Sequence, residues 1–149
     1  MTSDARVAMD QMYRHQRYFY DLTRKYYLFG RDKLIQELPV GGTDHICEVG
    51  CGTARNLVLL GRKHPQAKLY GVDASAEMLK TAGASVQAAG LSGQIKLATA
   101  LSTNFTPAML GHAKPFDRLI YSYSLSMMDD WQEALEHGFK QLKPGGTIH

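Results

Sequence analysis

A pair of glycines between an apolar run and a helical pattern constrains this chain more than any other feature. The sequence Glu48-Val49-Gly50-Cys51-Gly52-Thr53-Ala54 follows the apolar segment 45–49 and precedes a helical pattern over 56–63. Glycines let the backbone turn tightly and approach a ligand, and the N–H groups at the start of a helix point into the site. The pattern predicts a strand, a ligand-binding loop and a helix in succession.

An acidic residue ends the next predicted strand. Asp73 follows the apolar segment 68–72 and lies 21 residues after Gly52. A carboxylate at this place can accept hydrogen bonds from both ribose hydroxyls of an adenosine. Together, the loop and the acid favour a nucleoside site over a purely structural turn.

Strands and helices alternate along the rest of the chain. The pattern predicts strands at 95–100 and 116–122, helices at 75–89 and 131–142, and a fifth strand that begins near 147 after the turn 143–146. This order is typical of an α/β protein with a Rossmann-like, doubly wound, mostly parallel sheet.

The sequence divides into two parts at the proline and glycines after residue 38. Residues 1–38 are predicted to form an N-terminal helical cap, in which Gly30 ends one helix and Asp32 caps the next. Residues 39–149 form the predicted nucleoside-binding domain.

Composition excludes several classes of protein. The chain has 149 residues, the length of one domain, of which 44% are hydrophobic and 21% charged. No apolar run approaches the ~20 residues of a membrane-spanning helix, and the first residues carry no apolar signal segment. Cys47 and Cys51 are four residues apart on a strand-to-loop path that holds them too far apart to bridge, which indicates a reduced, cytoplasmic protein. The net charge of +3 does not require nucleic acid as a partner.

Two side chains indicate which nucleoside the loop takes. Arg55 occupies the position where a dinucleotide site usually has a third glycine, and its bulk opposes a pyrophosphate. Glu48 stands two residues before the first glycine, badly placed beside phosphates but well placed near a sulfonium or an ammonium. These residues favour a cationic nucleoside and disfavour a nicotinamide oxidoreductase.

The same segments resemble the successive motifs of class I S-adenosylmethionine-dependent methyltransferases. The resemblance runs from Asp44 to His149 and includes Phe116-Asp117-Arg118-Leu119 and Leu142-Lys143-Pro144-Gly145-Gly146, with Ala54 in place of the last glycine of the first motif. It implies an enzyme that uses S-adenosyl-L-methionine as its cofactor, bound by residues 39–149. It also implies a chain truncated at its C-terminus, because family members continue through the fifth strand and an antiparallel pair.

The resemblance also implies how the cofactor is held. The glycine loop holds the methionine moiety, Asp73 the ribose, and Ala74 and Met78 flank the adenine. Leu101 stands where the family often has an acid that meets the adenine amino group. The expected cofactor-binding residues are Tyr20, Arg24, Tyr27, Glu48, Gly50, Cys51, Gly52, Asn56, Asp73, Ala74, Met78, Ala100, Leu101 and Tyr121.

Segments 13–27 and 121–131 resemble bacterial betaine-lipid (diacylglycerylhomoserine) N-methyltransferases. This resemblance implies lipid metabolism, with a lipid-linked amine such as a homoserine headgroup as the methyl acceptor and peripheral contact with the inner membrane surface. Five of the eight tyrosines lie between Tyr13 and Tyr27, among arginines and a lysine. Aromatic faces can surround a quaternary ammonium, and a basic face can rest on anionic lipid, although the same helix could simply pack on the sheet.

Methyl transfer to an amine needs alignment, a neutral amine and exclusion of water. Tyr20, Tyr121 and Tyr123 are the expected catalytic residues, and no metal site is expected. Two alternatives stay open: a C- or O-methyltransferase of a quinone or other small molecule, and a non-catalytic nucleoside-binding fragment. The truncation predicts an unpaired edge on the strand 116–122 and self-association through it.

Overall fold

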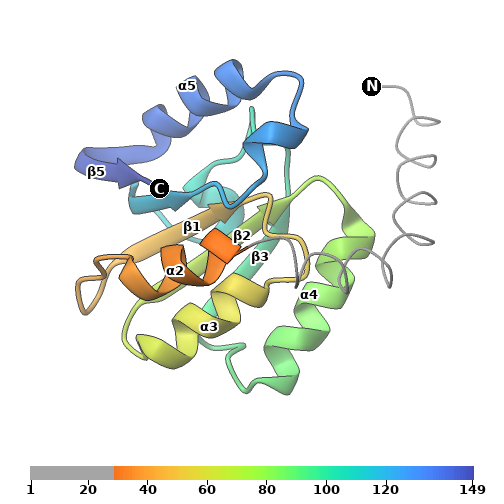
Figure 1. The fold of residues 1–149 in the computed structure, drawn as a ribbon, viewed down its shortest axis with the longest axis vertical. Helices are drawn as coiled ribbons and strands as arrows, with labels where there is room; N and C mark the ends of the chain where they lie inside the picture. Colours follow the sequence, from red (N-terminus) through yellow and green to blue (C-terminus); the bar gives the residue numbers. More distant parts are fainter. Residues whose placement is uncertain (1–28) are drawn as a thin grey trace.

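A five-stranded parallel sheet forms the centre of the computed structural model, which describes residues 29–149 (Figure 1). Its strands are β1 (His45–Val49), β2 (Lys68–Asp73), β3 (Ile95–Thr99), β4 (Phe116–Ile120) and β5 (Leu142–Ile148). The spatial order is β3-β2-β1-β4-β5, and every pairing is parallel. The strand order reverses beside β1, and doubly wound sheets bind ligands at the carboxyl ends of the strands at such a point.

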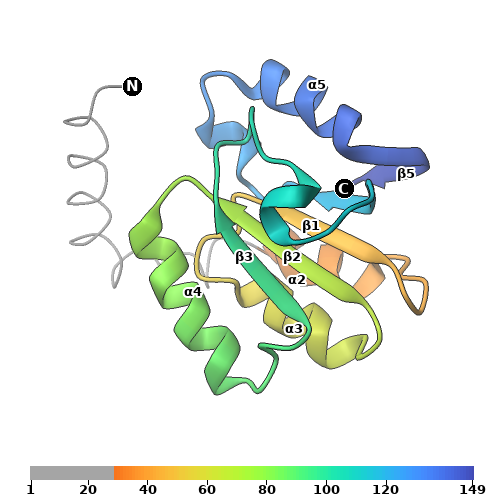
Figure 2. The same ribbon diagram turned by 180° about the vertical axis from the view of Figure 1, so that it is seen from behind.

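Helices cover both faces of the sheet. They are α2 (Phe29–Glu37), α3 (Arg55–Lys63), α4 (Ala76–Ala88) and α5 (Trp131–Gln141), with short 3₁₀ helices η1 (Pro107–Leu110) and η2 (Leu125–Met127). Figures 1 and 2 show α2, α3 and α4 on one face and α5 on the other. The predicted Rossmann-like α/β fold is confirmed. No helix within residues 29–149 is long and apolar enough to cross a membrane.

The two faces of β1 divide the core into two clusters. Ile46 packs with residues of α2, α3 and α4, whereas Cys47 and Val49 pack on the face that α5 covers. Leu57 and Leu60 of α3 are fully buried in the first cluster. Burying one leucine side chain contributes about 1.5–3 kcal/mol, so these contacts fix α3, and with it the loop that precedes it.

Helix α2 differs from the sequence prediction. Gly30 and Asp32 both lie inside α2, so the predicted break at Gly30 and cap at Asp32 are wrong. The Asp32 carboxylate instead accepts a hydrogen bond of 2.7 Å from Arg55. A side chain at position 30 would meet the hydroxyl of Tyr123, 3.0 Å from an ideal Cβ atom. Both residues are therefore explained by tertiary contacts rather than by helix ends.

Strand β5 covers the edge of β4. The Tyr121 N–H donates to the His149 carbonyl and the His149 N–H to the Leu119 carbonyl, both at 2.9 Å. The predicted unpaired edge of β4 is therefore wrong, because β4 lies between β1 and β5. The pairing begins earlier than expected, since Leu142 already pairs with Phe116 across an irregular register.

Candidate functional site

The loop after β1 has a backbone that only glycine adopts readily. Gly50 and Gly52 have φ angles of +76° and +54°. The N–H groups of Gly50 and Cys51 both donate to the Val72 carbonyl, at 2.8 and 3.0 Å. An ideal Cβ atom at Gly50 would lie 2.7 Å from the Cβ atom of Ser124. The loop is thus pinned to the end of β2 and leaves no room for a side chain at its first glycine.

The Asp73 carboxylate joins this loop to the start of α4. Its Oδ2 atom accepts from the Gly52 N–H and its Oδ1 atom from the Ser75 N–H, both at 2.9 Å. Ser75 caps α4, because its hydroxyl accepts from the Met78 N–H at 3.2 Å. The half-buried Asp73 carboxylate thus holds the glycine loop against the start of α4.

A second carboxylate lies beneath the loop. Glu48 is 2% exposed, and its Oε1 atom accepts from the Asn56 side-chain amide at 2.7 Å. The Asn56 oxygen in turn accepts from Nε of Arg31, at 2.9 Å. Residues from α2, β1 and α3 thus form a chain of side-chain hydrogen bonds that ends under the glycine loop.

The carboxylates of Glu48 and Asp73 both affect the pKa of Cys51, which lies in the glycine loop. Burial raises the pKa of the Cys51 thiol well above its ordinary value, and the charges of Glu48 and Asp73 raise it further. Burial and these charges therefore disfavour the thiolate, which is the nucleophilic form of cysteine. The same negative field opposes a phosphate at the loop and favours a cation.

The ends of β2 and β3 supply residues beside the loop. Ala74 is exposed directly after β2, whereas Met78 is buried in α4. The Ala100 N–H donates to the Asp73 carbonyl at 3.1 Å, which holds the end of β3 against that of β2. Leu101, the next residue, is half-buried. The residues expected around the adenine therefore lie at one edge of the sheet.

The two tyrosines after β4 point to different places. Tyr121 is buried on the α5 face, where its hydroxyl donates to the Ala134 carbonyl at 3.2 Å. Burial raises the pKa of Tyr121 to about 12. The structure therefore gives Tyr121 a packing role and does not bring its hydroxyl to the glycine loop. Tyr123 is 42% exposed, has a left-handed φ of +59°, and directs its hydroxyl toward Gly30 of α2.

Three expected site residues, Tyr20, Arg24 and Tyr27, lie outside the described residues. The structure adds two residues that no sequence pattern identified. Arg31 donates a hydrogen bond to Asn56, and the Ser124 hydroxyl donates to the Val49 carbonyl at 2.9 Å. Ser124 is separated from Val49 by 75 residues. No local pattern could have paired them.

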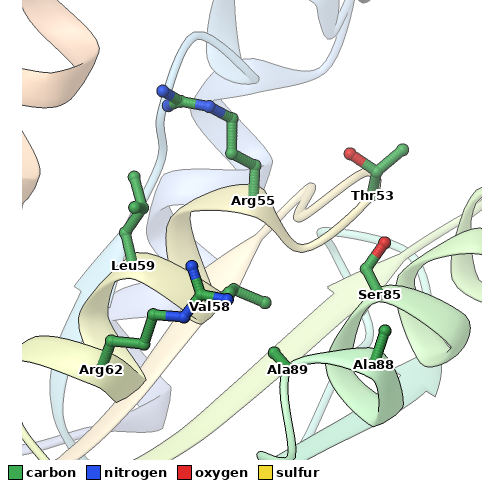
Figure 3. Close-up of a pocket in the computed structure, with 8 residues that line it drawn as sticks. All are labelled: Thr53, Arg55, Val58, Leu59, Arg62, Ser85, Ala88 and Ala89. Atoms are coloured by element: carbon green, nitrogen blue, oxygen red, sulfur yellow. The ribbon is translucent and has the colours of Figure 1, made fainter.

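A groove lies between α3 and α4 (Figure 3). Its lining is Thr53, Arg55, Val58, Leu59, Arg62, Ser85, Ala88 and Ala89. Glu48, Gly50 and Asp73 do not line this groove, which adjoins the glycine loop only at Thr53 and Arg55. Within residues 29–149, no group of three or more His, Cys, Asp or Glu side chains could hold a metal ion.

A sequence model of the methyltransferase domain family matches residues 46–146. The chain is 27% identical, over 115 residues, to a trans-aconitate 2-methyltransferase of Azoarcus sp. (strain BH72), an alignment that covers 77% of this chain and 41% of that protein. It is 28% identical, over 134 residues, to the ubiquinone/menaquinone biosynthesis C-methyltransferase UbiE of Syntrophotalea carbinolica, covering 87% of this chain and 54% of that protein. The chain thus spans about half or less of the length of these relatives.

The fold is also similar to a solved structure, the S-adenosylmethionine-dependent methyltransferase from Thiobacillus denitrificans in complex with S-adenosyl-L-homocysteine. The TM-score is 0.67 and the sequence identity 17%, over 87% of this chain and 53% of that one. At this identity the likeness establishes the fold.

Proposed function

The chain belongs to the methyltransferase domain family, and on that premise we propose that it binds S-adenosyl-L-methionine and serves in methyl transfer to a small-molecule acceptor. The observation that carries the proposal is the pair of carboxylates, Glu48 and Asp73, close to a glycine loop whose φ angles are positive. This arrangement suits a cationic nucleoside and opposes a pyrophosphate.

The residues of the site fit this cofactor. We expect the Asp73 carboxylate, which lies at the carboxyl end of β2 and binds the Gly52 N–H, to accept the two ribose hydroxyls. Gly50 and Gly52 let the backbone approach the methionine moiety, and Glu48 supplies negative potential beneath it. We expect Ala74, Met78, Ala100 and Leu101 to contact the adenine.

When bound, S-adenosylmethionine supplies an activated methyl group on its sulfonium. The task of the protein is then to align the acceptor with that methyl and to exclude water. Tyr123 stays our proposed acceptor-side residue, because it is exposed and its hydroxyl lies beside α2. No general base is required for an acceptor that arrives without its proton.

The acceptor class is a small molecule. The two relatives are named for trans-aconitate and for ubiquinone and menaquinone biosynthesis, and neither name refers to an amine lipid. The lipid-amine hypothesis, with membrane contact, depends mainly on the residues from Tyr13 to Tyr27, which lie outside the described part of the chain. It stays a prediction that an assay with lipid extracts can test.

Isothermal titration tests the proposal. S-adenosylmethionine and S-adenosylhomocysteine should both bind, whereas NAD should not, because the Glu48 carboxylate opposes its pyrophosphate and the loop lacks the third glycine of a dinucleotide site at position 55. Transfer of a labelled methyl group to a panel of small carboxylic acids, quinols and amine lipids then identifies the acceptor. Binding of NAD in preference to S-adenosylmethionine would overturn the proposal, and cofactor binding without transfer to any acceptor would favour a nucleoside-binding module.

A further inference from the structure

We propose that Arg31 is a positioning residue of the cofactor site: through the Asn56 amide it fixes the Glu48 carboxylate beneath the glycine loop. The inference rests on the proposed function and extends it to a residue of α2. On this proposal, the Arg31–Asn56–Glu48 chain of hydrogen bonds helps to bind the charged amino-acid end of the ligand. It does not affect the binding of the adenosine.

The donors and acceptors of this chain allow one arrangement. Arginine has donors only, so the Asn56 oxygen must face Arg31. The Asn56 NH₂ group then faces Glu48, to which it donates at 2.7 Å. If Arg31 were absent, the buried Asn56 oxygen would lose this donor, and the amide would be held less firmly against Glu48. Arg31 therefore reinforces the amide orientation that holds Glu48.

Burial makes this orientation important. Asn56 and Glu48 are each 2% exposed, so water cannot readily replace a lost hydrogen bond. A hydrogen bond to a buried charged group is stronger than one on the surface, and leaving such a group without its donor is costly. A misplaced Glu48 would move its charge relative to the loop.

The contacts that helix α2 makes with the rest of the fold place Arg31 beside Asn56. Asp32, the next residue, forms an ion pair of 2.7 Å with Arg55 at the start of α3. Gly30, the preceding residue, accommodates the Tyr123 hydroxyl, and Ile35 is buried in the core. The side chain of Lys63 also donates to the Gln36 carbonyl. Contacts on both sides of Arg31 thus fix the helix on α3.

The sign of the effect separates positioning from simple charge. A positive charge near the site opposes a cationic ligand, so removing it should strengthen cation binding if Arg31 acted only through space. Positioning predicts the reverse, because the loss of Arg31 frees Asn56 and weakens the hold on Glu48.

The experiment is a calorimetric titration with two ligands. S-adenosylmethionine carries a sulfonium, an ammonium and a carboxylate, whereas 5′-methylthioadenosine has the same adenosine but none of these charges. For Arg31→Met, which keeps an apolar stem of similar length, the affinity for S-adenosylmethionine should fall roughly 10-fold or more. The affinity for 5′-methylthioadenosine should change by less than about 2-fold.

Controls come from the same helix and the same chain of bonds. Lys33→Gln removes an exposed charge that pairs with Glu37, so it should leave both affinities unchanged. Arg31→Lys keeps a donor and should restore part of the lost affinity. In a Glu48→Gln background, Arg31→Met should have little further effect, because the carboxylate through which Arg31 acts is gone.

Each outcome is decisive. Unchanged or stronger binding of S-adenosylmethionine by Arg31→Met overturns the inference, and so does an equal loss for both ligands, which would indicate a structural role only. Full additivity with Glu48→Gln also overturns it. If the wild-type chain binds neither ligand, the proposed function itself is wrong.

Discussion

At Gly50, two independent constraints exclude a side chain. Its φ of +76° disfavours any L-residue, and an ideal Cβ atom would lie 2.7 Å from that of Ser124. Gly83, in the interior of α4, has nothing within 4 Å of such an atom. The two glycines therefore give opposite predictions for the same substitution.

We expect Gly50→Ala to lower the free energy of unfolding by roughly 2–4 kcal/mol, the sum of the backbone strain and the overpacking. Gly83→Ala should raise it by about 0.5–1 kcal/mol, because glycine is a poor helix former. Urea denaturation of both variants measures the difference. A neutral Gly50→Ala would show that the loop does not have the backbone described.

Asp73 has two tasks, and its substitution should affect both. Asp73→Ala removes the acceptor of the Gly52 and Ser75 N–H groups, so the free energy of unfolding should fall by about 1–3 kcal/mol. It also removes the proposed ribose acceptor, and the affinity for S-adenosylhomocysteine should fall about 10- to 1000-fold. Calorimetry and urea denaturation measure the two effects.

Asp117 provides the matched control. It is also a half-buried acid, and it accepts from the His45 N–H at 2.7 Å, but it lies at the amino-terminal end of β4. Asp117→Ala should therefore lower stability without changing the affinity for the nucleoside. Equal losses of affinity in the two variants would remove Asp73 from the site.

Tyr121, which directly follows β4, packs on the face of the sheet that α5 covers. Leu119 and Tyr121 face α5, whereas Ile120 between them faces the other cluster. Tyr121→Phe loses the bond to Ala134, and we expect a fall of about 0.5–1.5 kcal/mol in the free energy of unfolding. Cofactor affinity should stay unchanged. A variant of normal stability that binds the cofactor but no longer transfers methyl would instead make Tyr121 catalytic.

At the opposite end of the sheet from the candidate site, His112 stacks on His45 with ring centroids 4.0 Å apart. Burial lowers the pKa of His112 from its ordinary value of 6.5, and the charges of His45 and Lys114 lower it further, while Asp117 acts in the opposite direction. A lowered histidine pKa means that the unfolded chain binds the proton more readily. The stability from neutral His112 is therefore present above pH 6.5 and lost as the pH falls below it.

Urea denaturation at about pH 7.5 and about pH 5.5 tests this pH dependence. Wild type should lose stability at the lower pH, and His112→Gln should lose less. His64 and His149 have pKa values lowered mainly by burial, so some dependence should persist in the variant. An identical pH dependence in the two proteins would show that His112 does not contribute.

For the molecule as a whole, local patterns were sufficient for the elements that touch the cofactor site. The predicted segment 45–49 is β1 to the residue, and the predicted helix 75–89 corresponds to α4 together with its two cap residues, Ser75 and Ala89. Both depend on residues close together in the sequence. The fold class followed from their alternation.

Features that depend on distant residues could not be predicted in the same way. Arg31 and Asn56 are 25 residues apart, and neither carries a pattern that points to the other. β5 begins at Leu142 because it pairs with β4, and its Lys143 side chain forms an ion pair with Asp117. The orientation of Tyr121 could have been predicted from the sequence. Side chains alternate along an extended strand, and Tyr121 therefore lies on the same face of the sheet as Leu119.

The central claim is that a nucleoside lies at the carboxyl edge of β1 and β2, between the glycine loop and Asp73. Two-dimensional amide NMR of the labelled chain, titrated with S-adenosylhomocysteine, tests it most directly. We expect the largest shift changes at Gly50, Cys51, Gly52 and Asp73, with little change at Arg62, Ser85, Ala88 and Ala89 of the groove in Figure 3. Changes confined to that groove, or no saturable change, would contradict it.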